Sequence, residues 1–419
     1  MKAIPYSKTK NSQALAIGSI PLLSPEDFAS GADEQRASAR RILAFFRFQE
    51  RLFALFAQDE AASILWFSTS CSKNLGGKEI PESLRFLEKL PLFPFATLSI
   101  EARERLAKAH APALSWASTQ IPCTEPLDLY GAVAAMTRTQ KHPVSHALAA
   151  SLVLEALSGV EPKEIHQQRL MLLELERVAA YAEDLSSLFV ATAMTLPSSR
   201  FAKLHLLARQ CLSCLTGNPL GLDSIMPGGV KAPLMLPDYR KNFAKLRKNF
   251  AKMGRTDRLA ENAFFQEVGR ILPATAETTG AVGITARACG LPRDARHTHP
   301  VFSEPLPPPL VLAAEGDVGA RTKLRLQEIR TSLDLLGTLS PPKSVLQPIL
   351  APLAKESLAA SAIESPHGEV VHVLGTDDEG GLALWLAWPS SFYNTPALEE
   401  ALTGESLAHF PAIVSSILG

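Results

Sequence analysis

The sequence predicts an α+β protein that is mainly α-helical. Apolar residues recur at three- and four-residue steps through most of residues 128–252, and helical character returns at residues 319–339. Residues 368–389, GEVVHVLGTDDEGGLALWLAWP, have the alternation and the central turn of a β-hairpin. The helices are therefore expected in the middle of the chain and strands near its end.

The first part of the chain is less regular. Residues 1–30 contain AIGSIPLLSPEDF and are expected to be irregular or strand-like, because prolines interrupt them. Residues 34–58, EQRASARRILAFFRFQERLFALFAQ, are expected to form an amphipathic helix. Residues 60–125 alternate short apolar runs with Gly and Pro, and no order of elements is predicted there.

The helical section contains three clear helices, SHALAASLVLEAL, IHQQRLMLLELERVAAYAEDLSSLFVAT and SRFAKLHLLARQCLSCL. Stop signals follow the first in SGVEP and the third in TGNP. A two-unit repeat then follows, KNFAKLR and KNFAKMG, with Phe243, Leu246, Phe250 and Met253 on one helical face. We interpret it as a core stripe under a solvated basic face; the alternative is a docking surface for an acidic partner or lipid headgroups.

Two segments rich in Gly or Pro come next. Residues 278–300, TTGAVGITARACGLPRDARHTHP, are expected to be a structured loop region. Residues 303–317, SEPLPPPLVLAAEGD, are expected to be a stiff, extended connector.

Composition excludes several classes of protein. The chain has 419 residues, 42 Lys plus Arg and 42 Asp plus Glu, so no net field directs it to nucleic acid. Five scattered cysteines argue against a disulfide scaffold and for a reducing compartment. The N-terminal residues lack the apolar core of a signal peptide, and no apolar run is long enough to span a membrane.

Cys211 and Cys214, in RQCLSCLTG, have the spacing of metal sites and redox switches. Structural zinc usually takes four ligands, but the nearest histidine is His205, and Cys123 and Cys289 are isolated. Because the pair falls inside an apolar helix, we expect both cysteines to be packing residues.

His142 and His146 are four residues apart in KHPVSHALAA. Pro143 predicts that His142 precedes a helix and that His146 lies in its first turn. No third metal ligand is near them in sequence, so a metal site is the less favoured interpretation.

Arg177 lies in the apolar helix LLELERV, where a guanidinium needs a carboxylate or carbonyl partner. Asp294, Glu174 and Glu176 are the candidate partners. Structural ion pairing is the favoured role, and a polar cavity is the alternative.

Several segments together resemble a known family. SHALAASLVLEALSGVEP, RLMLLELERVAAYAEDLSSL, MTLPSSRFAKLHLLARQCLSCLTGNPLGLDSIMPGGV, GITARACGLPRDARHTHP, GDVGARTKLRLQEIRTSL, HGEVVHVLGTDDEGG, WPSSFYN and GESLAHFPAIVSSILG occur in one order. This series resembles the catalytic large subunit of energy-converting nickel–iron hydrogenases and its relative, the 49 kDa (D) subunit of respiratory NADH–quinone oxidoreductase. The resemblance covers residues 126–419 and marks residues 1–125 as a divergent N-terminal region.

The resemblance implies a long-helix bundle with small β elements from the termini, and an active site where the terminal regions meet. In these hydrogenases two Cys-x-x-Cys pairs hold nickel and iron through thiolates. The first pair precedes a Ser-His matched by Ser145 and His146, so its positions are Thr139 and His142. The second pair would follow SSIL, where the sequence stops at Gly419. The resemblance therefore implies a member whose nickel–iron site is lost.

The quinone oxidoreductase branch also lacks those cysteines and binds a quinone head group with a histidine and a tyrosine. Here the strand loop GSIPLLSP has no histidine, and the tyrosine position falls near Ala134, one turn from Tyr130. We expect Arg177 and Asp294 to belong to one polar cluster at the cavity. The candidate cavity-lining residues implied by the resemblance are His142, His146, Arg177, Arg287 and Asp294.

The expected function is that of a subunit in a membrane-associated electron-transfer complex of the hydrogenase or NADH–quinone oxidoreductase type. Its expected partners are a small iron–sulfur subunit and membrane-arm subunits, on the cytoplasmic face of the inner membrane. No cofactor is expected in this chain, apart from a possible quinone contact, and the iron–sulfur clusters are expected in the partners. The alternatives are a non-catalytic scaffold or assembly protein and a quinone-binding module with altered ligands.

Overall fold

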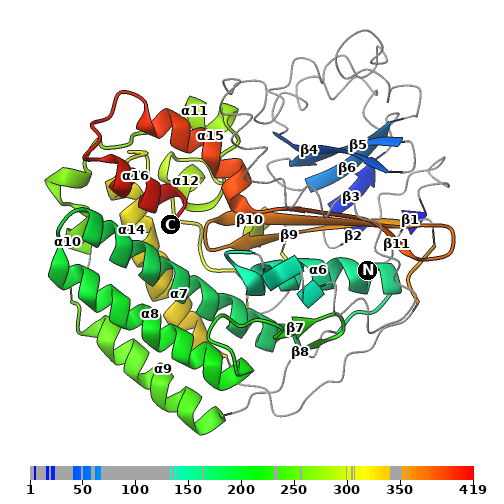
Figure 1. Cartoon of the computed structure of the whole chain (residues 1–419), viewed down its shortest axis with the longest axis horizontal. Helices are drawn as coiled ribbons and strands as arrows, with labels where there is room; N and C mark the ends of the chain where they lie inside the picture. Colours follow the sequence, from blue (N-terminus) through cyan, green and yellow to red (C-terminus); the bar gives the residue numbers. More distant parts are fainter. Residues whose placement is uncertain are drawn as a thin grey trace.

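The computed structural model describes six short N-terminal strands and most of residues 133–419. The residues left out of this second range are 135, 139, 163–164, 231–234, 255–256, 299, 303–304, 306, 340–351 and 356. The molecule is rich in helix and carries small sheets, as the sequence predicts (Figure 1). The proposed domain boundary at residue 125 lies outside the described residues.

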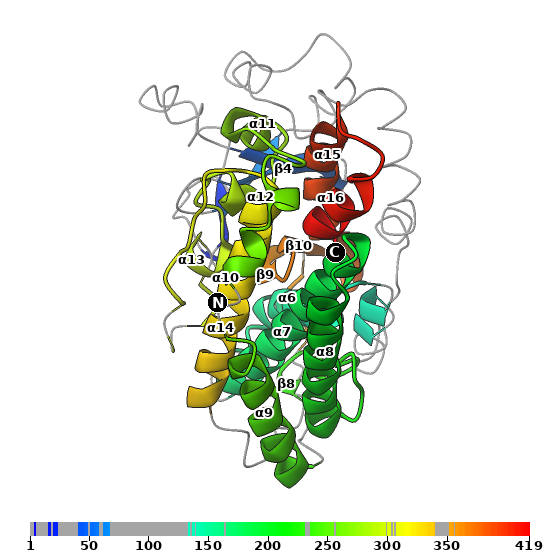
Figure 2. The same cartoon turned by 90° about the vertical axis from the view of Figure 1, so that its left-hand side faces the viewer.

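Five long helices build the helical part, α6 (Pro143–Ser158), α7 (His166–Ala191), α8 (Thr195–Thr216), α9 (Leu236–Ala251) and α14 (Val318–Thr338). Helix α7 packs against both α8 and α14, and α9 packs on α8 at the edge of the molecule (Figures 1 and 2). Helix α7 is buried along most of its 26 residues, since it lies between neighbours on several sides.

Shorter elements follow α9 and close the fold. They are α10 (Asp257–Ala260), η5 (Ala263–Phe265), α11 (Pro273–Thr278), α12 (Gly283–Ala288), α13 (Ala295–Thr298), α15 (Ser390–Leu402) and α16 (Phe410–Ile417). The segment expected as a structured loop thus contains the short helices α12 and α13. Figure 2 shows α15 and α16, in red, on the same side of the molecule as the chain end.

The predicted C-terminal hairpin is confirmed. Strands β10 (Gly368–Thr376) and β11 (Leu382–Trp388) are antiparallel, and β9 (Ser357–Ser365) and β1 (Ile4–Pro5) complete a four-stranded sheet in the order β1-β9-β10-β11. Helix α6 covers β9 and β10, and Ser361 Oγ donates to Ala149 O at 2.7 Å. Because helices cover it, β9 is buried at every position.

The helix expected at residues 34–58 is wrong. That stretch forms two antiparallel strands, β4 (Arg41–Phe48) and β5 (Arg51–Ala57), with Phe48 opposite Arg51. They join β6 (Ala62–Phe67), β3 (Ile20–Leu23) and β2 (Ala16–Ile17) in the order β2-β3-β6-β5-β4. The stretch is rich in phenylalanine, which favours strands, and pairing of β5 with β6 supplies a partner that local periodicity cannot reveal.

The predicted helix stops are confirmed at two glycines. Helix α6 ends at Gly159 with φ 70°, and α8 ends at Gly217 with φ 77°. Both are left-handed conformations, which glycine adopts without the steric cost that a Cβ brings. A third pair of short strands, β7 (Ile225–Met226) and β8 (Gly229–Val230), follows α8.

The repeat on α9 has the packing that the favoured interpretation predicts. Leu246 is fully buried, and Phe243, Phe250 and Met253 pack partly buried against the core. The lysines and arginines between them are exposed. The repeat therefore gives α9 an apolar stripe towards α8 and a basic face towards solvent.

Candidate functional site

Four segments that are distant in the sequence meet around one small pocket. They are the residues before and in the first turn of α6, the turn between β9 and β10, the start of α15, and the residue after α16. We call it the histidine pocket; its volume is about 310 Å³, within the range of small-ligand sites. It is lined by Lys141, His142, His146, His367, Pro389, Ser390, Ser391 and Leu418.

Local sequence explains why His142 lies at this junction. Pro143 occupies the first position of α6, so the preceding His142 is the N-cap residue, as predicted. His146 lies in the first turn, also as predicted. Lys141 Nζ donates to Leu418 O and Gly419 O at 2.6 Å each, which links the two ends of the described helical region.

His142 begins a chain of hydrogen bonds that runs into the core. Its Nε2 lies 2.9 Å from Nδ1 of His367, and Nε2 of His367 lies 2.6 Å from Oδ2 of Asp184. Arg325 Nε donates to the same oxygen at 3.1 Å. All four side chains are buried, so water does not compete with these bonds.

The direction of the protons in this chain follows from Asp184. An ionised carboxylate only accepts, so Nε2 of His367 carries the proton that it donates. Its Nδ1 then accepts from Nε2 of His142. Nδ1 of His142 is left unprotonated, and it makes no hydrogen bond within the described part of the chain. The pocket therefore contains one imidazole acceptor of fixed tautomer.

Electrostatics keep both imidazoles neutral and Asp184 charged. Burial lowers the pKa of His142 well below its usual value, and His367 and Lys141 lower it further. Burial also lowers the pKa of His367, although Asp184 opposes it. For Asp184 burial raises the pKa, but His367, Arg325 and Lys141 outweigh it and hold the pKa at about 2.

A second histidine pair supports the pocket from below. Nδ1 of His146 lies 2.9 Å from Nε2 of His372, and Trp385 Nε1 donates to Nδ1 of His372 at 3.1 Å. Burial lowers the pKa of His146 to about 3 and lowers that of His372 well below its usual value. This pair ties α6 to β10 and β11 without adding a charge.

Arg177, Arg287 and Asp294 belong to a buried charge cluster. We define this cluster as three arginines and four carboxylates, Arg177, Arg287, Arg296, Glu174, Asp294, Glu328 and Glu364. Arg287 Nη1 lies 2.5 Å from Glu328 Oε1 and 3.5 Å from Asp294 Oδ2. Arg296 Nη2 lies 2.6 Å from Asp294 Oδ2 and 2.8 Å from Glu328 Oε1.

The direct pairing of Arg177 with Asp294 is not observed. Arg177 Nε donates to Glu174 Oε1 at 3.3 Å, and its terminal nitrogens donate to the carbonyls of Ser365 and Glu364. Glu174 was one of the predicted partners. Glu176 instead accepts from the amides of Val144 and Ser145 at the start of α6.

Glu364 balances the charge of the cluster. One of its oxygens accepts from Ala295 N at 3.0 Å, and the other, 3.9 Å from Arg287 Nη2, makes no hydrogen bond. Burial raises its pKa to about 8; Asp294 adds to this, while Arg287 and Arg296 oppose it. A proton on Glu364 at neutral pH leaves three carboxylates for three guanidinium groups.

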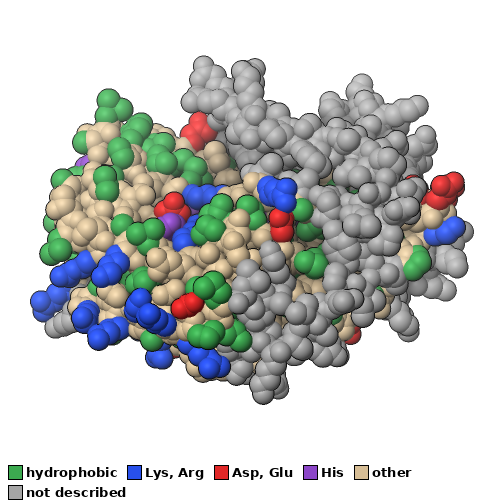
Figure 3. All heavy atoms as spheres, turned by 60° about the horizontal axis from the view of Figure 1, so that its bottom comes forward, with side chains coloured by type: hydrophobic (Ala, Val, Ile, Leu, Met, Phe, Trp, Pro, Cys, Tyr) green, Lys and Arg blue, Asp and Glu red, His purple; other side chains and the backbone are tan. Residues whose placement is uncertain are grey.

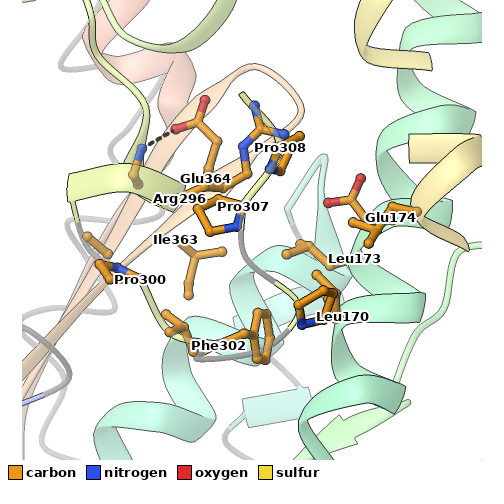
Figure 4. A pocket seen from close by; sticks show the side chains of 15 residues that line it. Leu170, Leu173, Glu174, Arg296, Pro300, Phe302, Pro307, Pro308, Ile363 and Glu364 are labelled. Atoms are coloured by element: carbon orange, nitrogen blue, oxygen red, sulfur yellow. Dashed lines mark hydrogen bonds between the residues drawn. The ribbon is translucent and has the colours of Figure 1, made fainter. Parts of the chain in front are cut away.

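An apolar hollow of about 500 Å³ lies beside the charge cluster (Figure 4). Leu170, Leu173, Phe302 and Ile363 line it, and prolines of the 300–308 segment form one wall. The segment expected as an extended connector therefore contributes part of this wall. Of the predicted site residues, only His142 and His146 line the histidine pocket, whereas Arg177, Arg287 and Asp294 are buried among their ion-pair partners.

The described residues do not fit a thiolate-held pair of nickel and iron. The lining of the histidine pocket offers imidazole, ammonium and hydroxyl groups, whereas such a site needs soft thiolates. Cys211 and Cys214 are buried in the core on α8, as expected for packing residues, and burial raises the pKa of Cys211 to about 12. Thr139 and Tyr130 lie outside the described residues, and Ala134 is half-buried.

Sequence reasoning missed His367, Asp184 and Arg325. Asp184 stands on the same apolar helix as Arg177, so an unexplained buried carboxylate was the available signal. Within the described residues no group of three His, Cys, Asp or Glu side chains could hold a metal ion. Among those residues, no helix combines the length and apolarity that crossing a bilayer requires.

Comparisons with known proteins agree with this architecture. Residues 201–341 match the family model of the respiratory-chain NADH dehydrogenase 49 kDa subunit. Formate hydrogenlyase subunit 5 of Escherichia coli (strain K12) is 26% identical over 286 residues, which are 65% of this chain and 50% of that protein. The (D) subunit of NADH-quinone oxidoreductase from Geobacillus thermodenitrificans (strain NG80-2) is 27% identical over 315 residues, 71% of this chain and 81% of that protein.

A further relative is membrane-bound hydrogenase subunit alpha of Pyrococcus furiosus, 26% identical over 294 residues, 63% of this chain and 68% of that protein. Among solved structures, a chain of the membrane-bound sulfane sulfur reductase, an archaeal respiratory membrane complex, superposes with a TM-score of 0.63. It is 22% identical, over 73% of this chain and 85% of that chain. This last likeness concerns the fold alone.

Proposed function

The chain carries a domain of the 49 kDa subunit family of respiratory NADH dehydrogenase, and from that premise we propose that it is a subunit of a membrane-associated electron-transfer complex. Its homologues are subunits of hydrogenase-like and NADH–quinone oxidoreductase-like complexes. We also propose that α6, α7, α8, α9 and α14 form the long-helix bundle of this family, and that the nickel–iron site is lost.

The observation that carries this proposal is the histidine pocket. His142 stands at a position that the resemblance assigns to a metal-binding cysteine, and it is hydrogen-bonded to His367 instead of to a metal. The pocket has a fixed imidazole acceptor in Nδ1 of His142, backed by Asp184 through His367. Such an arrangement can accept a hydrogen bond or a proton from a small ligand.

The proposed partners are a small iron–sulfur subunit, which supplies the clusters, and membrane-arm subunits that hold this chain peripherally on the cytoplasmic face. The homologues support this because they belong to assemblies of several subunits. Neutral imidazoles in the pocket are compatible with a non-metal role for this chain in such an assembly.

The test is purification of the whole complex from membranes in a mild detergent, through an affinity tag on the N-terminus. We expect an iron–sulfur subunit and integral membrane subunits to co-purify, with iron present by elemental analysis. Recovery of the chain alone from the soluble fraction would contradict the proposal.

Two variants distinguish electron transfer from a scaffold role. His142→Gln removes the acceptor in the histidine pocket, and His297→Gln, an exposed histidine that contacts Pro308 O, is the matched control. In an electron-transfer subunit His142→Gln lowers electron transfer from reduced viologen to a soluble quinone analogue, while assembly and the control are unchanged. Equal rates in both variants would favour the scaffold alternative.

A quinone-binding module is the second candidate, because Nδ1 of His142 is complementary to a quinol hydroxyl. Equilibrium binding of the same soluble analogue to the purified complex tests it. Binding that His142→Gln weakens, and that His297→Gln leaves unchanged, favours this candidate over a scaffold.

A further inference from the structure

Helices α8 and α9 carry a strong charge asymmetry within a chain of zero net charge. Helix α8 has three basic residues and no acidic one, and α9 has five basic residues and only Asp238. Lys252, at the end of α9, adds a further cation. Positive charge that the whole sequence balances is therefore concentrated on two adjacent helices.

The basic side chains of α9 form what we call the basic face. It consists of Arg240, Lys241, Lys245, Arg247, Lys248 and Lys252, all of which are exposed. Lys and Arg side chains gather at the end of the molecule that these helices occupy (Figure 3). Arg200 and Lys203 of α8 are exposed as well.

Little in the described structure neutralises this face. Arg247 pairs with Asp334, whose carboxylate is mostly exposed and lies 4.0 Å from Arg247 Nη2. The five other cations of the basic face make no ion pair with the described residues. A helix of 16 residues is about 24 Å long, so the charge extends as a stripe and is not concentrated at one point.

The composition of the basic face favours lipid headgroups over a folded acidic partner. Four of its six cations are lysines, and lysine is depleted in protein–protein interfaces, where arginine and aromatic anchors dominate. The apolar residues of α9 are turned into the core, so the face offers no apolar anchor to a protein partner. Lysines on long, mobile stems suit the diffuse negative charge of a bilayer surface.

We propose that the basic face of α9 binds the anionic phospholipid headgroups of a membrane directly. The family resemblance places peripheral attachment on partner subunits, whereas this contact is made by the chain itself. It does not depend on the electron-transfer role, because a scaffold protein with the same face would bind in the same way. Its strength is electrostatic, so ionic strength weakens it.

The test is co-sedimentation of the full-length purified chain with vesicles. Phosphatidylcholine vesicles are compared with phosphatidylcholine vesicles that contain phosphatidylserine, at low and at physiological salt. We expect binding to the anionic vesicles only, and release as salt is raised. Circular dichroism and thermal melting establish that each variant is folded.

A matched pair of triple variants locates the contact. Lys241→Gln, Lys245→Gln and Lys248→Gln remove three charges from the basic face, and Arg270→Gln, Lys323→Gln and Lys355→Gln remove three exposed charges elsewhere. Each lysine near anionic headgroups contributes about fivefold to binding, so the first variant is expected to bind roughly a hundredfold more weakly. The second is expected to bind nearly as well as the parent chain.

Three results would overturn the proposal. Equal loss in both triple variants would show that net charge, not this face, drives binding. Equal binding to neutral vesicles would show that headgroup charge is irrelevant. Absence of vesicle binding, together with binding of a polyglutamate peptide that the first variant loses, would assign the face to an acidic protein segment instead.

Discussion

Nε2 of His142 and Nδ1 of His367 lie 2.9 Å apart, although 225 residues separate them in the chain. The contact joins the start of α6 to the turn between β9 and β10, and it fixes the tautomer of both rings. The histidine pocket thus depends on a tertiary contact between two side chains whose positions in sequence give no hint of proximity.

Replacing Asp184 by Asn is expected to reverse the protons along this chain. An amide nitrogen can donate to Nε2 of His367, which would then carry its proton on Nδ1 and donate to His142. Nitrogen NMR of histidine-labelled protein measures which ring nitrogens are protonated. A His142 ring protonated on Nδ1 in the parent chain would contradict the present assignment.

The purified complex is expected to contain less than one equivalent of nickel per chain. Imidazole, ammonium and hydroxyl groups line the histidine pocket, and such donors do not replace bridging thiolates. Elemental analysis after removal of loosely bound ions measures the ratio. A stoichiometric, chelator-resistant nickel ion would refute the inferred loss of the metal site.

Replacing Cys211 and Cys214 together by Ala is expected to cost a few kcal/mol of unfolding free energy at most, since both are core residues. Urea unfolding followed by circular dichroism measures the change. Lys203→Ala on the exposed side of the same helix is the control and is expected to change stability little. Loss of a bound cofactor from a folded double variant would count against a packing role.

Removing Glu328 is expected to destabilise the fold by about 3 to 5 kcal/mol, because it leaves Arg287 buried without its closest partner. A double-mutant cycle of Arg287→Met and Glu328→Gln should show strong coupling. The exposed pair Arg138 and Asp223, 2.6 Å apart, is the control and should show no measurable coupling. Simple additivity at Arg287 and Glu328 would remove the argument for a cooperative charge cluster.

Glu364 is expected to make the fold less stable as pH rises towards 8. Its pKa in the folded state is about 8, above the unfolded value near 4.3, so the folded state holds an extra proton between them. Stability from this group is complete below the lower value and is lost as pH rises through the upper one. His146, with a pKa of about 3, acts in the opposite sense only below about pH 6.5.

The measurement is the unfolding free energy between about pH 6.5 and pH 9, a range that spans the titration of Glu364, in the parent chain and in Glu364→Gln. The parent is expected to lose stability across this range and the variant to lose less. Identical pH profiles would show that Glu364 is ionised in the folded protein at neutral pH.

Local signals in the sequence were sufficient for much of the helical part. Gly159 and Gly217 end α6 and α8 where the stop signals predicted, and Pro143 correctly placed His142 before α6. These features depend on residues within one or two turns of each other. The β10–β11 hairpin is local in the same way, because its strands are joined by a short turn.

Features that depend on distant partners were not predictable in this way. Residues 41–57 satisfy both helical and strand spacing, and the pairing of β5 with β6 decides between them. Arg177 needed a carboxylate, but whether Glu174 or Asp294 supplies it depends on how α7 meets the loop before α13. His142 was identified from its motif, whereas its link to Asp184 through His367 required the fold.

The histidine pocket also has a consequence for synthesis of the protein on the ribosome. Lys141 bonds to carbonyls that are 277 and 278 residues further along the chain. Helices α6 to α9 can collapse early, because their contacts are close in sequence, but closing so long a loop is slow. A nascent chain therefore exposes His142 until residue 418 has left the exit tunnel, which gives chaperones or partner subunits a period in which the open pocket is accessible.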